Sequence, residues 1–285
     1  MGVYILTDST SYIDEHIRQE LDIKIVALSV IFENENFKET DIDNESFYKM
    51  MDAKGIPTSS QPSVEELYNE MKSVVEYGDS LLCIFLSSDM SGTYSTAHLA
   101  KDMILENYKN ANIEILDSRS NSMQLGFAAI VAARAAKEGK TLVQVKEAAK
   151  SNMKRSRMLF IPNNLEYLRK GGRIGGANAL IGNFLKIIPI LTVENGKTTI
   201  LTKVRTKKNA IITMVDKMLQ DINDYGLGEI VIHHINCYDE AKELADLIRK
   251  KLNVNLSICA LGPVIGLHVG PGTVAIVYYT KKDMI

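Results

Sequence analysis

One segment of this 285-residue chain carries the clearest fold signal: SLLCIFLSSDMSGTY, residues 80–94. An apolar run of strand length, residues 80–86, leads into a turn rich in hydroxyl side chains, and a helical pattern over residues 92–107 follows. The same order of apolar run, polar turn and amphipathic helix recurs along most of the chain. Strands that alternate with helices in this way predict α/β units with largely parallel sheets.

The same periodicity predicts the other elements. Capping boxes at Ser63–Glu66 and Thr141–Gln144 mark two helix starts, and Asn195-Gly196 between apolar runs predicts a β-hairpin. The expected strands span residues 3–7, 23–31, 80–86, 112–116, 157–161, 198–204, 229–234, 255–260 and 273–279. The expected helices span residues 64–77, 92–107, 121–138, 142–153, 163–170, 206–223 and 239–252.

The length of the chain predicts about two domains. A polar segment, Ser151 to Arg157, separates a long helical region from a new strand, so we place the boundary near residue 155. The expected units are an N-terminal α/β domain over residues 1–155 and a C-terminal α/β domain over residues 156–285. Each is expected to hold a largely parallel or mixed sheet flanked by helices.

Composition excludes several classes of protein. Lys and Arg total 33 against 35 Asp and Glu, a net charge of -2, which lacks the basic excess that nucleic-acid or membrane-surface binding needs. No apolar run reaches the ~18 residues of a membrane span. The three scattered cysteines support neither a disulfide framework nor a metal knuckle. The first residues lead straight into a strand-like run without the features of a signal peptide, so a cytoplasmic location is expected.

Four turns of the chain are rich in hydroxyl side chains: three follow expected strands, and one precedes an expected helix. The first strand ends in Asp8-Ser9-Thr10-Ser11, strand 112–116 ends in Asp117-Ser118, and residues 57–63 read PTSSQPS, beside the turn at residues 87–94. Ligands of open α/β sheets bind at the carboxyl ends of the strands, and free N–H groups at helix starts suit an anion. A carboxylate held by uncharged donors fits this pattern. The alternative is that each Ser or Thr only caps its helix.

Two further clusters combine glycine with chemically active side chains. Residues 167–176, YLRKGGRIGG, place basic side chains beside a flexible turn, although a C-capped helix explains them as well. Residues 262–272, GPVIGLHVGPG, contain four glycines and two prolines, which predict a rigid loop that holds His268 among apolar neighbours. In such a loop His268 is a candidate ligand contact.

The segments that resemble nucleotide and metal sites do not match the full motifs. Gly196-Lys197-Thr198 resembles the end of a phosphate-binding loop, but Leu191 stands where that motif needs glycine, and a strand pattern follows instead of a helix. His233 and His234 are neighbours in an apolar strand, so their side chains point to opposite faces and cannot share a metal. The sequence therefore predicts no metal and no cofactor.

Taken together, these clusters resemble the DegV family of bacterial fatty-acid-binding proteins, over essentially the whole chain. Each motif alone is weak, but all of them in one order are specific. The segments that carry the resemblance are Thr7–Thr10, Thr58–Ser63, Ser87–Tyr94, Asp117-Ser118, Leu168–Ile174, Pro189–Leu191 and Gly262–Gly272.

The resemblance implies two α/β domains with one long-chain fatty acid in a buried tunnel between them. It implies that Ser59, Ser91 and His268 bind the carboxylate, and that Arg205 lies near the mouth of the pocket. Ser59-Ser60 stands where the family usually has Thr-Ser, which keeps the hydroxyl donor but loses a methyl group.

Proteins of this kind resemble the acyl-carrying subunit of a two-component fatty acid kinase, which presents the carboxylate to an ATP-binding partner. The partner makes an acyl phosphate that can enter phospholipid synthesis. Arg173, in the basic segment from Arg169 to Arg173, and Arg205 are then expected on the face that meets the partner. Two alternatives stay open at this point: a serine-based acyl hydrolase with His268 as base, and a regulatory protein that senses lipid without donating it.

Overall fold

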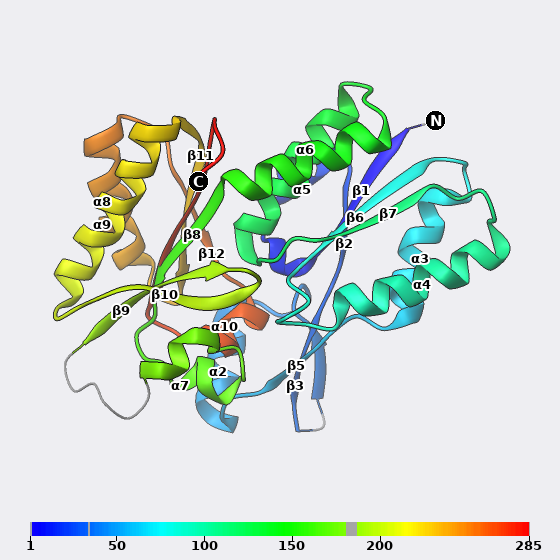
Figure 1. Ribbon diagram of the computed structural model, residues 1–285. Helices are drawn as coiled ribbons and strands as arrows, with labels where there is room; N and C mark the ends of the chain where they lie inside the picture. The colour runs from blue at the N-terminus through cyan, green and yellow to red at the C-terminus, as the bar shows by residue number, and fades with distance from the viewer. Residues whose placement is uncertain (1, 34, 181–186, 285) are drawn as a thin grey trace.

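The computed structural model of the chain describes residues 2–33, 35–180 and 187–284. Two α/β halves lie side by side, and α5 (Ser122–Lys137) and α6 (Leu142–Arg155) lead from one into the other (Figure 1). The fold class expected from the sequence, two α/β units with a parallel and a mixed sheet flanked by helices, is confirmed. β8 (Ser156–Ile161), the first strand of the second half, begins directly after α6.

The first half is built on a parallel sheet of four strands in the order β2-β1-β6-β7, namely Ile23–Val26, Val3–Asp8, Ser80–Phe85 and Ile113–Asp117. Helices cover both faces, so alternate residues of each strand enter different cores. Leu82 and Ile84 pack with α5, whereas Leu81 and Cys83 pack with α3 (Val64–Val75) and α4 (Thr93–Asn107). This explains why β6 is apolar throughout.

The second half is built on a mixed sheet of six strands in the order β10-β9-β8-β13-β11-β12. The strands besides β8 are β9 (Ile188–Glu194), β10 (Lys197–Val204), β11 (Leu227–Ile235), β12 (Ser257–Ala260) and β13 (Thr273–Thr280). Helices α8 (Lys207–Tyr225) and α9 (Tyr238–Leu252) cover one face. The opposite face turns toward α5 and the first half.

A small third sheet completes the molecule. Its order is β4-β3-β5, formed by Glu35–Lys38, Ser29–Phe32 and Thr58–Ser60, and all its pairs are antiparallel. Helix α10 (Pro263–Val269), from the far end of the chain, packs against β3 and β5 and against α7 (Glu166–Lys170), as Figure 1 shows in the middle of the molecule. Helices α1 (Glu15–Leu21) and α2 (Asn44–Lys54) complete the first half of the molecule. This sheet and helices α1, α2 and α10 were not expected from the sequence.

Local signals in the sequence predict the local structure well. The capping boxes at Ser63–Glu66 and Thr141–Gln144 are both formed. Asn195 and Gly196 connect antiparallel β9 and β10, and both have positive φ (50° and 80°), as the tight hairpin turn requires. Helix α7 begins at Glu166, three residues later than expected.

Two expectations were wrong. The single strand expected over residues 23–31 is two strands in different sheets, because the N–H of Leu28 donates to Ser9 Oγ (3.0 Å) instead of to a strand partner. The rigid loop expected over residues 262–272 contains helix α10, which Pro263 starts at its first position. Its glycines allow close packing: a Cβ on Gly266 would come within 2.3 Å of the Tyr48 hydroxyl.

Candidate functional site

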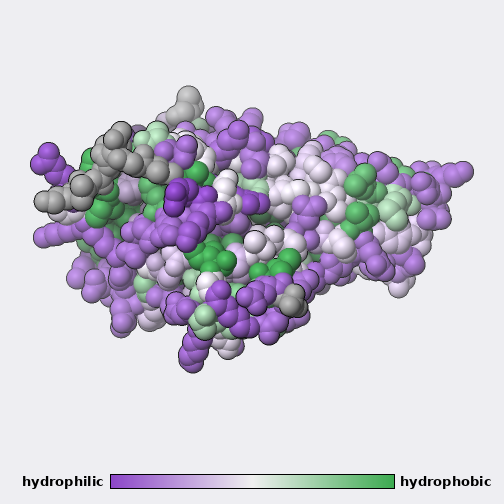
Figure 2. All heavy atoms as spheres, turned by 90° about the horizontal axis from the view of Figure 1, so that it is seen from below, coloured by the Kyte–Doolittle hydropathy of each residue, from purple (hydrophilic) through white to green (hydrophobic). Residues whose placement is uncertain are grey.

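A cavity of about 360 Å³ lies between the two halves, and its walls are mostly apolar. The inner face of the mixed sheet contributes Met158, Phe160, Val193 and Ala275, and α10 contributes Val264 and Ile265. Leu28 and Leu86 close it from the side of the parallel sheet. Seen from below in Figure 2, apolar side chains break the polar surface near the middle of this face. The volume and the lining are typical of a small-molecule site, for which roughly 300–1,000 Å³ is usual.

Ser59 and His268 form the polar contact that marks one part of this cavity. Ser59 lies on β5, where it pairs with Val30 of β3, and His268 lies in the last turn of α10. Ser59 Oγ is 2.9 Å from His268 Nε2, and both residues line the cavity. The other ring nitrogen, Nδ1, is buried without a hydrogen-bond partner among the described residues.

The histidine is neutral at physiological pH. Burial first, and the charge of Arg173 second, lower the pKa of His268 to about 4. A neutral imidazole carries one N–H, and the unpartnered Nδ1 fits a tautomer that bears this hydrogen on Nε2. The ring therefore offers a donor at the cavity and no positive charge.

Ser91 lines the same cavity from the loop that joins β6 to α4. Its Oγ is 2.9 Å from Thr93 Oγ1 and accepts the N–H of Thr93 at 3.3 Å. The structure thus brings Ser59, Ser91 and His268 to one cavity, although only Ser59 and His268 contact each other.

The cavity wall also holds two side-chain amides to which the sequence assigned no role, those of Gln61 and Asn121. Gln61 Nε2 donates to Thr96 Oγ1 at 2.5 Å, and Gln61 is packed so closely on Gly92 that a Cβ there would lie 2.1 Å from Gln61 Oε1. Uncharged amides are common throughout the chain, so the residue type alone gave neither of them a role. The segment Thr58–Ser63 did draw attention to Gln61, without a role for it.

Arg173 and Arg205, the two arginines expected on the partner face, occupy different places in the structure. Arg173 lines the cavity, and its guanidinium donates to the backbone oxygens of Met90 (3.0 Å) and Gly171 (2.6 Å). Arg205 is exposed just after β10 and is not part of the cavity lining.

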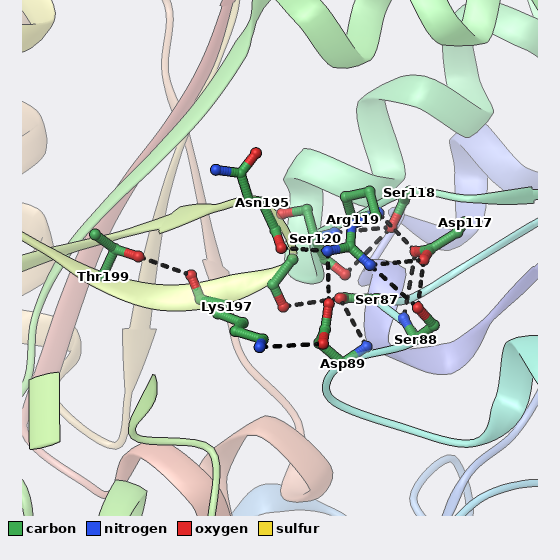
Figure 3. Close-up of polar contacts among 11 residues, drawn as sticks. Ser87, Ser88, Asp89, Asp117, Ser118, Arg119, Ser120, Asn195, Lys197 and Thr199 are labelled. Atoms are coloured by element: carbon green, nitrogen blue, oxygen red, sulfur yellow. Dashed lines mark hydrogen bonds and ion pairs between the residues drawn. The ribbon is translucent and has the colours of Figure 1, made fainter. Parts of the chain in front are cut away.

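A polar cluster ties the tip of the β9–β10 hairpin to the parallel sheet beside the cavity, as Figure 3 shows. Ser87 Oγ donates to the Gly196 carbonyl at 2.8 Å, and Arg119 donates to the Asn195 carbonyl. Asp89 forms ion pairs with Arg119 (2.5 Å) and Lys197 (3.5 Å). The hairpin carries Val193 and Thr198 into the cavity wall, so this cluster fixes one side of the cavity.

Comparison with known proteins agrees with this architecture over the full length. A model of the DegV family matches residues 2–281. The chain belongs to the DegV family. A DegV domain-containing protein from Clostridium acetobutylicum is 64% identical over 284 residues, which cover 100% of both chains. The residues that line the cavity of this DegV chain therefore belong to segments that a family-wide model aligns.

Solved structures of DegV proteins share the fold. DegV from Bacillus subtilis, described as a fatty acid binding protein, superposes with a TM-score of 0.86 at 31% identity and covers 99% of this chain and 100% of its own. A stearic acid-binding protein from Eubacterium ventriosum gives a TM-score of 0.88 at 25% identity, with 98% of each chain covered.

The described part of this DegV chain lacks two further features. No helix there is long and apolar enough to span a membrane. Residues 2–33, 35–180 and 187–284 also contain no group of three or more His, Cys, Asp or Glu side chains placed to hold a metal ion.

Proposed function

We propose that this chain binds one long-chain fatty acid in the cavity and presents its carboxylate to a separate ATP-dependent kinase. The observation that carries the proposal is an apolar cavity that also holds the Ser59–His268 contact. The fatty-acid binding described for the relatives from Bacillus subtilis and Eubacterium ventriosum supports it.

The apolar walls account for the affinity. Burying roughly fifteen methylenes at ~0.8 kcal/mol each contributes about 12 kcal/mol, against an association cost of ~4 kcal/mol or more. The tail therefore supplies most of the binding free energy. Met90, Met158 and Phe160 are cavity residues that can adjust to the shape of an acyl chain.

The polar residues account for orientation. A buried carboxylate needs hydrogen-bond donors, and the hydroxyls of Ser59 and Ser91 and the Nε2–H of His268 can supply them. None of these donors is charged, so the carboxylate would keep its negative charge available to a reaction partner. Arg173, which is exposed, brings a cationic side chain to the cavity lining.

The chemistry is assigned to the partner subunit, and this chain acts as a carrier without a cofactor of its own. A carboxylate oxygen would form a bond to the γ-phosphorus of ATP while the bond to the ADP oxygen breaks, which yields an acyl phosphate for phospholipid synthesis. Arg173 and the exposed Arg205 are the cations we assign to the docking face. A reaction that uses ATP in this way belongs in the cytoplasm.

One observation favours a second candidate, a serine-based acyl hydrolase: Ser59 Oγ is within hydrogen-bond distance of His268. Two features oppose it. A catalytic base needs a pKa near the working pH, and that of His268 is lowered to about 4. In addition, no described group orients Nδ1, the place where a catalytic triad has a carboxylate.

The experiment that tests the proposal uses delipidated protein. Palmitate should raise the melting temperature by binding linkage, and hexadecane, which lacks the carboxyl group, should do so poorly. Acyl phosphate should then form only when a fatty acid kinase subunit and ATP are added. Burst cleavage of an activated acyl ester by the chain alone, lost in Ser59→Ala or Ser91→Ala, would establish the hydrolase. Lipid binding without product in the presence of the kinase would establish a lipid sensor.

A further inference from the structure

A buried carboxylate outside the proposed lipid contacts holds the helix that carries His268. Glu39 follows β4 and is only 6% exposed. One of its oxygens, Oε2, accepts the hydroxyl of Tyr12 (3.0 Å) and the backbone N–H of Val264 (3.1 Å). The other, Oε1, accepts the hydroxyl of Ser9. No part of the carrier scheme above uses this group.

Tyr12 completes the arrangement from the segment after β1. Its hydroxyl donates to Glu39 and accepts the N–H of Ile265 at 3.2 Å. The first N–H groups of any helix lack partners within the helix, and Gly262, which precedes α10, has no side chain to cap them. Glu39 and Tyr12 supply the missing acceptors from residues more than two hundred positions away in the sequence. A negative charge at this end of a helix is also electrostatically favourable.

The backbone of α10 is pressed onto these two acceptors. A Cβ on Gly262 would lie 2.7 Å from Tyr12 Cε1 and 3.0 Å from Glu39 Oε2. Helix α10 has only seven residues, which is too short to be stable without outside contacts. Val264, whose N–H binds Glu39, and His268 are four residues apart and therefore lie on one face of the helix, and both line the cavity.

We propose that Glu39, together with Tyr12, is a positioning residue for the carboxylate-binding end of the cavity, because it fixes the first turn of α10 and so the place of His268 against Ser59. The inference rests on the proposed function. It assigns Glu39 no contact with the fatty acid itself.

The surroundings of Glu39 also make the device sensitive to pH. The titratable groups that face it are Asp8 and Tyr12, from the segment of β1, and Tyr48 from α2, whereas the first turn of α10 carries no charged side chain. Burial raises the pKa of Glu39 to about 7, since none of these neighbours is a cation. Ionisation of this buried carboxyl is therefore disfavoured in the folded protein, and the arrangement around Glu39 loses stability as pH rises through about 7.

The test compares the variants Glu39→Gln, Glu39→Ala and Tyr12→Phe with wild type in calorimetric titrations of palmitate and 1-hexadecanol. Glu35→Gln, on the neighbouring exposed strand β4, is the matched control. Loss of the α10 contacts should weaken palmitate binding about tenfold in Glu39→Ala and Tyr12→Phe, and leave the alcohol and the control nearly unchanged. In the His268→Ala background the same changes should lose most of their effect, because the residue they position is gone.

One further readout separates positioning from failure of the proposed function. Hydrogen exchange of the α10 amides should accelerate in lipid-free Glu39→Gln and Tyr12→Phe, whether or not any fatty acid binds.

Unchanged α10 exchange in these variants would overturn the inference and leave the lipid proposal intact. Equal weakening of palmitate and 1-hexadecanol, or additivity with His268→Ala, would also overturn it. If wild type binds neither ligand, the proposed function fails and the exchange data still decide whether Glu39 holds α10. Should Glu39→Ala fail to fold, Glu39→Gln and Tyr12→Phe decide the same question.

Discussion

Ser59 Oγ lies 2.9 Å from His268 Nε2, although 209 positions separate the two residues in the sequence. The first comes from an edge strand of the small sheet, the second from helix α10 near the other end of the chain. Their contact joins the two halves of the molecule at a cavity with apolar walls. This pairing is the geometric basis of the proposed carrier function, because it places uncharged donors at the apolar cavity.

Removal of the imidazole should weaken fatty-acid binding without unfolding the protein. Replacing His268 by Ala leaves a buried carboxylate short of a donor, at a cost of ~1–3 kcal/mol, or roughly tenfold to a hundredfold in affinity. Calorimetric titration with palmitate measures it. His16→Ala, at an exposed position in α1, is the control. Wild-type affinity in His268→Ala would show that the ring makes no contact with the head group.

The close approach of Gly171 to the imidazole gives a second prediction. A Cβ on Gly171 would lie 2.2 Å from His268 Nδ1, so Gly171→Ala should displace the ring and weaken palmitate binding about tenfold. Gly176→Ala is a matched control, because its Cβ would lie 3.7 Å from the nearest atom. Melting curves of both variants should stay near that of wild type. Equal palmitate affinity in the two variants would contradict a head-group role for the ring position.

The hairpin contact beside the cavity predicts a difference between neighbouring serines. Ser87 is fully buried, and its Oγ donates to Gly196 and accepts the N–H of Asp89, so Ser87→Ala should lower the free energy of unfolding by ~1–3 kcal/mol. Ser88 is exposed, and Ser88→Ala should change it by less than ~0.5 kcal/mol. Denaturant titrations compare them. An equally large loss of unfolding free energy in Ser88→Ala would show that the contact of Ser87 with the hairpin does not account for the effect.

The buried carboxyl of Glu39 predicts a pH-dependent stability. Its pKa is raised from 4.5 to about 7 in the folded protein, so the folded state binds the proton more tightly than the unfolded chain does. The contribution of this group is therefore full below pH ~4.5 and is lost as pH rises through about 7. Wild type should lose stability relative to Glu39→Gln between about pH 5 and pH 8 in denaturant titrations. Parallel curves for the two proteins would show that Glu39 does not titrate in this range.

The sequence predicts an element of this structure well when the residues that determine the element are neighbours in the chain. Asn195-Gly196 and the capping boxes depend on residues within four positions, and all were found from the sequence. Helix α10 was missed because its start is capped by Glu39 and Tyr12, which no local rule connects to residues 263–265. The strand expected over residues 23–31 was wrong for the same reason, since Ser9 takes the N–H of Leu28.

The candidate site divides in the same way. Ser59, Ser91 and His268 stood in distinctive motifs, and the structure places all of them at one cavity. Gln61 and Asn121 line it too, but they are uncharged residues whose role depends on what lies opposite them. Arg205 was expected near the mouth of the pocket from the family resemblance; it is exposed and is not among the lining residues, and its place at the mouth stays a prediction.

The most direct test of the account is mass spectrometry of the lipid that co-purifies with the native protein. Protein isolated without detergent should carry one fatty acid per chain, released as a free acid on denaturation. The His268→Ala variant, prepared identically, should carry substantially less. Protein that retains no fatty acid, and that takes up none when palmitate is added after purification, would contradict the carrier function.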